Sequence, residues 1–358
     1  MKTVLTGGGT GGHIYPAVSV GQALLEADTD AELLFVGSSH GPEGDIAKSF
    51  GIPFQAVPSA PLTKSVSLRS ASALWKLFMG VFRARRILKK FGPDVVIGTG
   101  GYTTAAVLLA ARSLGLRTII HEQNAVPGRT NRWLARISDK VCVTFEGSAA
   151  FFPNGKVVVT GMPVRREFAL LPNKAEARRK LGMAEDAFTI LVVGGSQGAK
   201  RVNEIVMDMW PLVDDGRTQV LHQVGQRNVD QCRANPVTAS EMYHVEAYLD
   251  MPTAVAAADM VICRSGASTI AEITAAGLPS ILIPYPHAYA DHQRLNADYV
   301  VKHGAAVMCE ESTATGESLA KIVNDLRSSP EKLKAMASAS QSLGKPNAAA
   351  HVAQVARS

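Results

Sequence analysis

Short apolar runs alternate along this chain with longer segments in which apolar and polar residues recur at helical spacing. The apolar runs that predict strands are residues 3–6, 33–36, 95–97, 118–121 and 140–143 in the first half, and 190–193, 219–223, 260–263, 280–284 and 306–309 in the second. Strands that alternate with helices are typical of right-handed β-α-β units and parallel sheets. The pattern therefore predicts an α/β protein.

Two glycine-rich turns indicate that this pattern starts twice. One follows the apolar run 3–6 as Gly7-Gly8-Gly9-Thr10-Gly11-Gly12, and the other follows 190–193 as Gly194-Gly195-Ser196-Gln197-Gly198. A strand, a glycine turn and a helix begin a doubly wound sheet, and 358 residues exceed what one core usually covers. We expect two Rossmann-like domains that face across a cleft, residues 1–162 and 163–339, with a C-terminal helix over 340–358 completing the first.

The composition, 46% hydrophobic and 19% charged residues, suits a packed globular protein. No apolar stretch approaches the ~20 residues of a membrane-spanning helix, and the N-terminus lacks the apolar region of a signal peptide, so we expect a cytoplasmic protein. A net charge of +6 favours phosphorylated ligands or anionic lipid. Without a nucleic-acid-binding motif, no nucleic acid partner is expected. The four cysteines form no CxxC pair, so no zinc site is indicated.

The first glycine turn predicts an anion site. Gly7, Gly9 and Gly12 satisfy G-x-G-x-x-G, which lets an anion approach the backbone at a helix N-terminus. A dinucleotide site also needs an acidic residue at the end of the second strand, where this chain has Gly37-Ser38. No Gly-Lys-Ser/Thr follows the turn, which excludes a P-loop.

The second glycine turn allows two interpretations. Gly194-Gly195-Ser196-Gln197-Gly198 matches the nucleophile elbow of α/β-hydrolases, and Ser196 can equally donate to a phosphate at the start of a helix. The residues available to complete a triad are Asp259 or Asp291 with His287, His292 or His303. A hydrolase does not explain the other sheet with its own glycine turn.

A nucleotide-binding pattern follows the apolar run 260–263. Small residues from Ser265 onward can open a helix whose N-terminus faces an anion, with Ser268, Thr269 and Glu272 on neighbouring positions. Glu272 could then accept hydrogen bonds from the two hydroxyls of a ribose. An ordinary helix start with an acidic first turn is the alternative. Further on, Asp291 and Gln293 could hold a sugar, although Asp291 could also simply cap a helix.

Residues 68–90 predict an amphipathic helix. Arg69, Lys76, Arg83 and Lys90 recur every seven residues. The apolar bulk comes from Leu74, Trp75, Phe78, Val81 and Phe82. Such a helix can lie on an anionic membrane. The alternative is a helix packed on the core with a solvated basic face.

In their order along the chain, these motifs resemble the MurG family of UDP-N-acetylglucosamine transferases, part of glycosyltransferase family 28. The resemblance covers residues 4–300 and rests on residues 8–13, 100–102, 121–124, 161–165, 194–199, 264–267 and 291–293. It implies a GT-B fold, UDP-N-acetylglucosamine as donor, undecaprenyl-diphospho-muramoyl-pentapeptide as acceptor and inversion at the anomeric carbon. It also implies a peripheral position on the cytoplasmic face of the plasma membrane. No cofactor is expected, and no obligatory metal, because the helix that starts near Gly266 would offset the charge that grows on the diphosphate.

The resemblance also implies roles for particular residues. Thr10, Gly11 and Gly12 would lie near the diphosphate and the acceptor, and Asn124 would reach the sugar. The donor would further be bound by Arg165 at the hinge, Ser196 at the phosphates, the Leu249 backbone at the uracil, and Gln293 at the N-acetylglucosamine. The helix that binds the nucleotide would comprise Ala267, Ser268, Thr269, Ile270, Ala271 and Glu272, with Glu272 on the ribose.

His13 is the candidate general base, because histidine titrates near neutral pH and the first glycine turn places it in the expected cleft. The alternative is that His13 only orients this turn. The membrane patch would be Leu74, Trp75, Phe78, Phe82 and Arg83. The chain departs from the family pattern at Met162, at residues 61–64, and at residues 38–43, where no arginine precedes Glu43. A transferase for another acceptor and a UDP-N-acetylglucosamine 2-epimerase are the remaining alternatives.

Overall fold

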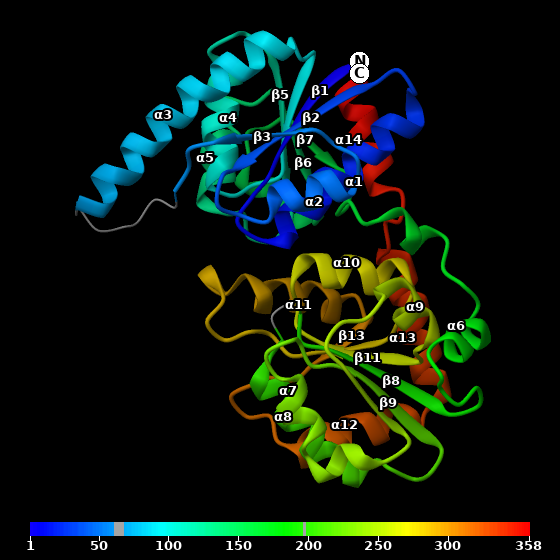
Figure 1. Cartoon of the computed structure of the whole chain (residues 1–358). Coiled ribbons are helices and arrows are strands. Elements are labelled where there is room, and N and C mark those ends of the chain that lie inside the picture. Colours follow the sequence, from blue (N-terminus) through cyan, green and yellow to red (C-terminus); the bar gives the residue numbers. More distant parts are fainter. Residues whose placement is uncertain (61–67, 196–197) are drawn as a thin grey trace. The chain divides into compact units, whose positions relative to one another are not determined.

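The computed structural model describes residues 1–60, 68–195 and 198–358, which form two compact units (Figure 1). Unit 1 comprises Met1–Arg165 and Pro346–Ser358, and unit 2 comprises Arg166–Lys345. Residues 61–67 and the pair Ser196 and Gln197 lie outside the described residues, so the role of Ser196 stays a prediction.

The described part of unit 1 contains a parallel sheet of seven strands in the order β3-β2-β1-β4-β5-β6-β7. The strands are β1 (Lys2–Thr6), β2 (Glu32–Ser38), β3 (Phe54–Val57), β4 (Val95–Gly98), β5 (Arg117–Glu122), β6 (Lys140–Val143) and β7 (Val157–Val159). The chain winds outward from β1 in one direction and then from β4 in the other. The switch point of this doubly wound sheet therefore lies between β1 and β4.

Helices cover both faces of this sheet (Figure 1). They are α1 (Gly11–Ala27), α2 (Glu43–Ser49), α3 (Leu68–Phe91), α4 (Tyr102–Arg112), α5 (Arg129–Leu134), the 3-10 helix η1 (Glu146–Phe151) and α14 (Ala348–Arg357). Successive strand residues point to opposite faces, so Val4 joins the core under α3 and α4 while Leu5 joins the core under α1 and α14. This two-sided burial explains why the strands read as continuous apolar runs.

Unit 2 repeats the arrangement with the strand order β10-β9-β8-β11-β12-β13, so its switch point lies between β8 and β11. The strands are β8 (Phe188–Val193), β9 (Thr218–Gln223), β10 (Tyr243–Glu246), β11 (Met260–Cys263), β12 (Ser280–Leu282) and β13 (Ala306–Met308). The α-helices are α6 (Lys174–Lys180), α7 (Lys200–Met209), α8 (Val229–Arg233), α9 (Met251–Ala257), α10 (Ala267–Ala275), α11 (His292–Lys302), α12 (Gly316–Arg327) and α13 (Pro330–Leu343). Short 3-10 helices are η2 (Arg166–Ala169), η3 (Trp210–Leu212), η4 (Pro236–Ala239) and η5 (Tyr289–Asp291).

The predicted α/β fold with two doubly wound parallel sheets is confirmed, and each predicted strand forms. The sequence pattern missed β3, β7 and β10, which are all edge strands. An edge strand is less completely covered than a central one, and these three expose Gln55, Val159 and Glu246. Their sequences therefore lack the clear apolar run that marked the central strands.

The expected single helix over 340–358 is wrong in its extent. Helix α13 already ends at Leu343 and α14 begins at Ala348, because Gly344 and Pro346 interrupt the helix between them. Val352 of α14 is buried in the same core as Ile14 of α1, and the Arg357 guanidinium donates to the Ala27 carbonyl at 3.3 Å. The last helix of the chain is therefore part of the core of unit 1.

Candidate active site

The loops that follow β1 and β4 meet at the switch point of unit 1. The Gly8 N–H donates to the Gly100 carbonyl at 3.2 Å, and the Thr99 hydroxyl donates to the His13 carbonyl at 2.6 Å. Ligands of doubly wound sheets bind at the carboxyl ends of the strands beside such a point. The first glycine turn and His13 thus lie where unit 1 is expected to bind a ligand.

The His13 side chain has a defined tautomer. Its Nδ1 lies 3.0 Å from the Gly8 carbonyl oxygen and 3.5 Å from the Thr10 hydroxyl. A carbonyl oxygen can only accept, so Nδ1 carries the proton and Nε2 is the basic nitrogen of the neutral ring. A Cβ placed on Gly100 would lie 3.2 Å from Nε2, so the half-buried ring lies against the loop after β4.

Thr10, Gly11 and Gly12 form the start of α1. Thr10 is exposed in extended conformation and its side chain makes no capping hydrogen bond within the described chain, while Gly11 and Gly12 are half-buried. The first turn of a helix has backbone N–H groups without intrahelical partners and carries positive potential. These residues can therefore present donors to an anionic or hydroxylated ligand.

Glu122 organises the turn that contains Asn124. The buried carboxylate accepts from the Asn124 backbone at 2.9 Å and from the Asn131 side chain at 2.9 Å, with weaker bonds from the Asn124 side chain and the Gly128 N–H. Burial raises the pKa of Glu122, and these hydrogen bonds oppose the rise. Asn124 is thereby held, half-buried, beyond the carboxyl end of β5.

The buried His121 side chain connects two segments of unit 1. It is fully buried, and its Nε2 lies 2.9 Å from the Gly161 carbonyl, to which it donates. This bond ties β5 to the segment that leads to Arg165, the half-buried residue that ends the first stretch of unit 1. Met162, a departure from the family pattern, is buried there and lies 3.8 Å from the Thr144 hydroxyl through its sulfur.

The switch point of unit 2 holds the predicted nucleotide-binding helix. Helix α10 begins at Ala267 after Gly266, as the sequence predicts, and the Arg264 N–H donates to the Val193 carbonyl of β8 at 3.3 Å. Ala267 and Ile270 are buried in the core. The partly exposed residues of this helix are Ser268, Thr269, Ala271, Glu272 and Ala275. Only the latter set turns its side chains away from the core.

Arg264 is part of a family motif that gave it no role, and no sequence motif singled out Glu311. The almost fully buried Arg264 guanidinium pairs with Glu311, donates to the carbonyls of Ile283 and Pro284 at 3.1 Å each, and lies 5.3 Å from the centre of the Tyr285 ring. It thereby fixes the loop after β12 to the start of α10. An arginine directly after a buried apolar strand was the available signal.

The loop after β12 leads to Gln293 through strained backbone. Ala290 and Asp291 both have positive φ angles, 50° and 53°, which cost of the order of 1–2 kcal/mol for a non-glycine residue. The Gln293 side-chain oxygen accepts the Tyr285 N–H at 3.0 Å, and Asn296 donates to the Ser265 carbonyl at 3.2 Å. Asp291 makes no side-chain capping bond to α11 among the described residues, so it does not act as a simple helix cap.

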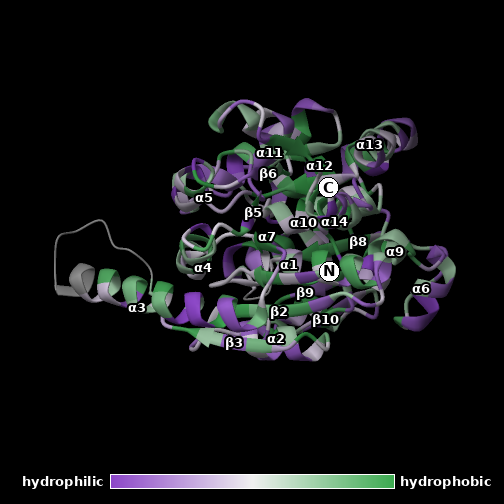
Figure 2. Ribbon diagram, turned by 90° about the horizontal axis from the view of Figure 1, so that it is seen from above, coloured by the Kyte–Doolittle hydropathy of each residue, from purple (hydrophilic) through white to green (hydrophobic). Residues whose placement is uncertain are grey.

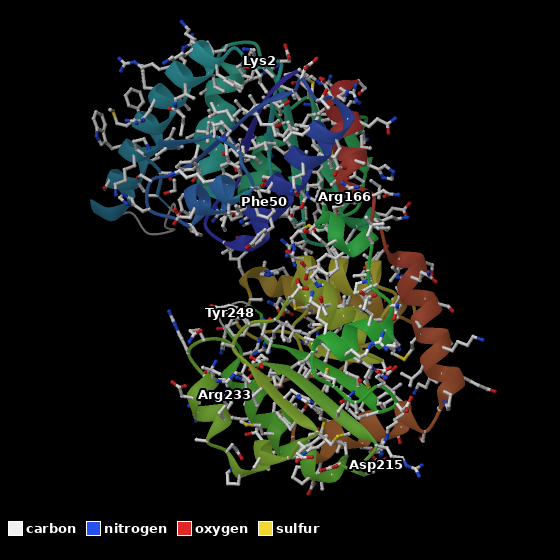
Figure 3. All side chains as sticks on the ribbon, turned by 45° about the vertical axis from the view of Figure 1, so that its right-hand side comes forward. Lys2, Phe50, Arg166, Asp215, Arg233 and Tyr248 are labelled. Carbon is white, nitrogen blue, oxygen red and sulfur yellow. The ribbon has the colours of Figure 1, made fainter. Side chains whose placement is uncertain are left out.

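Leu249 lies in the loop after β10, at the edge of the sheet where α10 also begins. Its N–H donates to the Gln223 side chain at 3.1 Å, which fixes the backbone of this loop to the end of β9. Tyr248 beside it is exposed. Figure 3 shows Tyr248 after β10 and Asp215 before β9 at opposite ends of unit 2.

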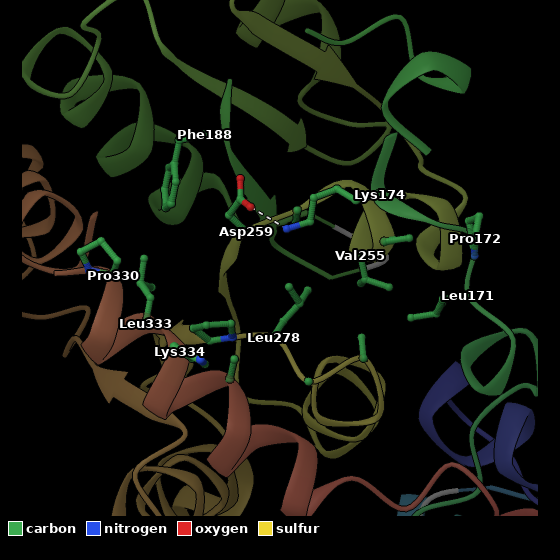
Figure 4. A pocket seen from close by; sticks show the side chains of 16 residues that line it. Leu171, Pro172, Lys174, Phe188, Val255, Asp259, Leu278, Pro330, Leu333 and Lys334 are labelled. Atoms are coloured by element: carbon green, nitrogen blue, oxygen red, sulfur yellow. Dashed lines mark hydrogen bonds and ion pairs between the residues drawn. The ribbon is translucent and has the colours of Figure 1, made fainter. Parts of the chain in front are cut away.

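Asp259 is at the wrong edge of the sheet for the hydrolase interpretation. It precedes β11 and forms an ion pair with Lys174 at 2.6 Å (Figure 4). A second ion pair joins it to Arg178 at 2.7 Å. A cavity of about 450 Å³ opens beside it at this amino edge, away from the loops that follow the strands. Gly194 and Gly195, which follow β8, lie at the opposite, carboxyl edge of the sheet, so Asp259 does not lie beside the described part of the second glycine turn.

Helix α3 exposes its aromatic residues. It packs on unit 1 through Leu77, Val81 and Leu88, and its N-terminal end extends past the rest of that unit (Figure 1). The exposed set is Leu74, Trp75, Phe78, Met79 and Phe82, all between 42% and 64% accessible, with Arg83 beside them. Apolar turns come first and basic turns follow (Figure 2). The exposed face of α3 is therefore apolar as well as basic, which differs from the solvated basic face of the alternative interpretation.

Among the described helices, none has both the length and the apolar character needed to span a bilayer.

Two doubly wound units, each with loops gathered at its switch point, define a GT-B glycosyltransferase fold. The model of the glycosyltransferase family 28 N-terminal domain matches residues 3–143, and that of the family 28 C-terminal domain matches residues 189–352. The chain belongs to glycosyltransferase family 28, as its motifs predicted.

The most informative relatives cover almost the whole chain. The UDP-N-acetylglucosamine–N-acetylmuramyl-(pentapeptide) pyrophosphoryl-undecaprenol N-acetylglucosamine transferase of Desulforamulus reducens is 42% identical over 97% of this chain and 96% of its own. The crystal structure of Acinetobacter baumannii MurG is similar with a TM-score of 0.81 and 31% identity over 99% of both chains. The UDP-N-acetylglucosamine 2-epimerase of Neisseria meningitidis, bound to UDP-N-acetylglucosamine, has a TM-score of 0.70 over 99% of both chains, but 15% identity shows a shared fold alone.

His121 gives unit 1 a pH-dependent stability. Burial lowers the pKa of His121 from 6.5 to about 4. Between these two pH values the unfolded chain binds a proton at this histidine that the folded chain does not. The free energy of unfolding is therefore unaffected by His121 above pH 6.5 and falls as the pH is lowered further, by up to about 3 kcal/mol at pH 4. His121→Gln keeps a donor for Gly161 and should flatten this slope in urea unfolding from pH 7.5 to 4.5. The exposed His40→Gln serves as control, and an unchanged slope in His121→Gln would contradict the assignment.

Proposed function

We propose that this chain transfers N-acetylglucosamine from UDP-N-acetylglucosamine to the C4 hydroxyl of the muramoyl sugar of undecaprenyl-diphospho-muramoyl-pentapeptide. The observation that carries the proposal is 42% identity, over almost the full length of both chains, to a relative that bears this activity in its name. The two candidate sites are the loops at the two switch points, which is where doubly wound sheets bind their ligands.

Unit 2 binds the donor in this proposal. The N-terminus of α10 receives the diphosphate, because its unpaired N–H groups and positive potential favour an anion. Glu272 accepts from the ribose hydroxyls, with Ser268 and Thr269 beside it, and Ala267, Ile270 and Ala271 shape the helix. The Leu249 carbonyl meets the uracil, since the Leu249 N–H already donates to Gln223. Gln293, at the start of α11 after the loop that Arg264 fixes, binds the N-acetylglucosamine.

Unit 1 supplies the base. Nε2 of His13 takes the proton of the C4 hydroxyl as its oxygen attacks C1 of N-acetylglucosamine, and the bond from C1 to the diphosphate oxygen breaks on the opposite side. UDP leaves with the bonding electrons, and the configuration at C1 inverts. Donors aimed at the charge that grows on the diphosphate stabilise this transition state. Thr10, Gly11 and Gly12 lie near the diphosphate and the acceptor, and Asn124 reaches the sugar. Arg165 at the hinge and Ser196 at the phosphates add contacts to the donor.

A transfer assay tests this function. With radiolabelled UDP-N-acetylglucosamine, label should appear on the lipid-linked muramoyl-pentapeptide and remain on the donor when acceptor is omitted. His13→Ala should lower kcat by about 10²- to 10⁴-fold, the usual contribution of a general base, with little change in donor affinity. Donor turnover without acceptor would favour an epimerase or hydrolase, whereas transfer only to a different acceptor would correct the substrate. Full turnover in His13→Ala would remove His13 as the base.

We also propose that the exposed face of α3 binds the cytoplasmic face of the plasma membrane, where the lipid-linked acceptor lies. Leu74, Trp75, Phe78 and Phe82 offer apolar area, and Arg83 with the following basic residues suits anionic headgroups. Each basic residue near such a surface contributes about 1 kcal/mol. The aromatic rings already pack together, with ring centres 5.7 Å apart for Trp75 and Phe78 and 4.6 Å apart for Phe78 and Phe82.

Liposome co-sedimentation tests this surface. The double variant Trp75→Glu, Phe78→Glu should lose most of its binding to vesicles that contain anionic phospholipid, because two charges replace the inserted rings. Trp133→Glu changes a similarly exposed aromatic residue on α5 and should bind as wild type does. Wild-type binding should weaken as salt is raised. Retained binding in the double variant would exclude α3.

A further inference from the structure

Glu43, the first residue of α2, is a buried acid that the proposed mechanism does not use. Its side chain is fully buried. One carboxylate oxygen, Oε1, accepts the Gly9 N–H at 3.0 Å, and the other, Oε2, has no hydrogen-bond partner among the described residues. A buried acid with so few partners is costly to the fold, which points to a role beyond packing.

The backbone around Glu43 leaves room for its carboxylate. A Cβ on Gly8 would lie 2.4 Å from Oε1, and a Cβ on Gly41 would lie 1.8 Å from Oε2. Any other residue at either position would displace the carboxylate or the loop. Because Gly8 and Gly41 have no side chains, the Glu43 carboxylate can contact the backbone of the first glycine turn.

One peptide group connects Glu43 to His13. The peptide bond between Gly8 and Gly9 donates its N–H to Glu43 and accepts, through its oxygen, from Nδ1 of His13 at 3.0 Å. Hydrogen bonds in series polarise one another. Donation to a carboxylate draws electron density toward the Gly8 oxygen, which then binds the Nδ1 proton more strongly.

We propose that Glu43 is a positioning residue for the base His13 and acts through the peptide bond between Gly8 and Gly9. The carboxylate holds the glycine turn, fixes the His13 tautomer with Nε2 as the basic nitrogen, and stabilises the ring when it becomes positively charged. The arrangement resembles an acid–histidine pair with a peptide group inserted between the partners. This inference rests on the proposed role of His13.

Other titratable groups of unit 1 are connected to the two loops that surround His13. The ring of Tyr102 on α4 would lie 3.4 Å from a Cβ on Gly9. Glu122 at the end of β5 binds Asn131, whose side chain would be 3.6 Å from a Cβ on Gly100. The buried His121 is linked to the loop after β4 through Gln123, which donates to the Thr99 carbonyl. All three remain unchanged in the variants below, so a change between variants reports on Glu43.

The test compares Glu43→Gln, which keeps an oxygen for the Gly9 N–H and removes the charge, with wild type. The acid limb of the pH profile of kcat/KM should move to lower pH by about half a unit to one unit, because an imidazolium loses a stabilising negative charge. The plateau of kcat should fall about three- to tenfold with the KM for UDP-N-acetylglucosamine within about twofold. Asp45→Asn removes an exposed acid from the same helix and should leave the profile unchanged.

Two further measurements keep the test decisive. NMR titration of the His13 ring in the resting enzyme should show the same downward shift in Glu43→Gln without reference to activity. Gly41→Ala, which displaces the carboxylate without removing it, should reproduce the effect if Glu43→Gln folds poorly. If His13→Ala loses activity but Glu43→Gln and Gly41→Ala keep the wild-type profile and titration, the role of Glu43 is overturned alone. Full activity in His13→Ala overturns both the base assignment and this inference.

Discussion

The switch point of each parallel sheet is the constraint on which the candidate sites depend. Where the winding direction reverses, the loops after two adjacent strands diverge to opposite faces and leave their backbone groups at one edge. In unit 1 these loops follow β1 and β4 and hold His13, and in unit 2 they follow β8 and β11 and begin α10. Parallel strands all end at this edge, so the loops after β5, β10 and β12 bring Asn124, Leu249 and Gln293 to the same edges of their own units.

Buried charged groups then hold these loops in place. Glu122 accepts four hydrogen bonds around Asn124. Arg264 links the start of α10 to the loop after β12 through two carbonyls and to the loop after β13 through Glu311. Glu43 accepts a hydrogen bond from the Gly9 N–H of the first glycine turn. Each is an ionisable group removed from water, which is costly to the fold where its partners are few. Glu122 and Arg264 are well supplied with partners, whereas Glu43 has only the Gly9 N–H among the described residues. The side chains proposed to contact ligand are therefore positioned by buried polar contacts.

Much of this was predictable from sequence because central parallel strands are buried on both faces and their loops carry glycine. The strands β1, β8 and β11, the glycine turns and the start of α10 all follow from that pattern. The edge strands β3, β7 and β10 could not be predicted in the same way, since partial exposure blurs their apolar runs. The contacts of Glu43 and Arg264 were also out of reach, because their partners lie 34 residues away for Glu43 with Gly9 and 47 for Arg264 with Glu311 (43 − 9 and 311 − 264). Only the folded chain shows that pairing.

Calorimetric titration with UDP-N-acetylglucosamine most directly tests the central claim that the switch point of unit 2 binds the donor through α10. Glu272→Gln should weaken donor binding about 10- to 100-fold, since a hydrogen bond to a charged group contributes about 1.5–3 kcal/mol. Glu317→Gln, an exposed acid in the first turn of α12, should bind as wild type does. Wild-type affinity in Glu272→Gln, with the fold intact, would contradict the placement of the ribose on α10.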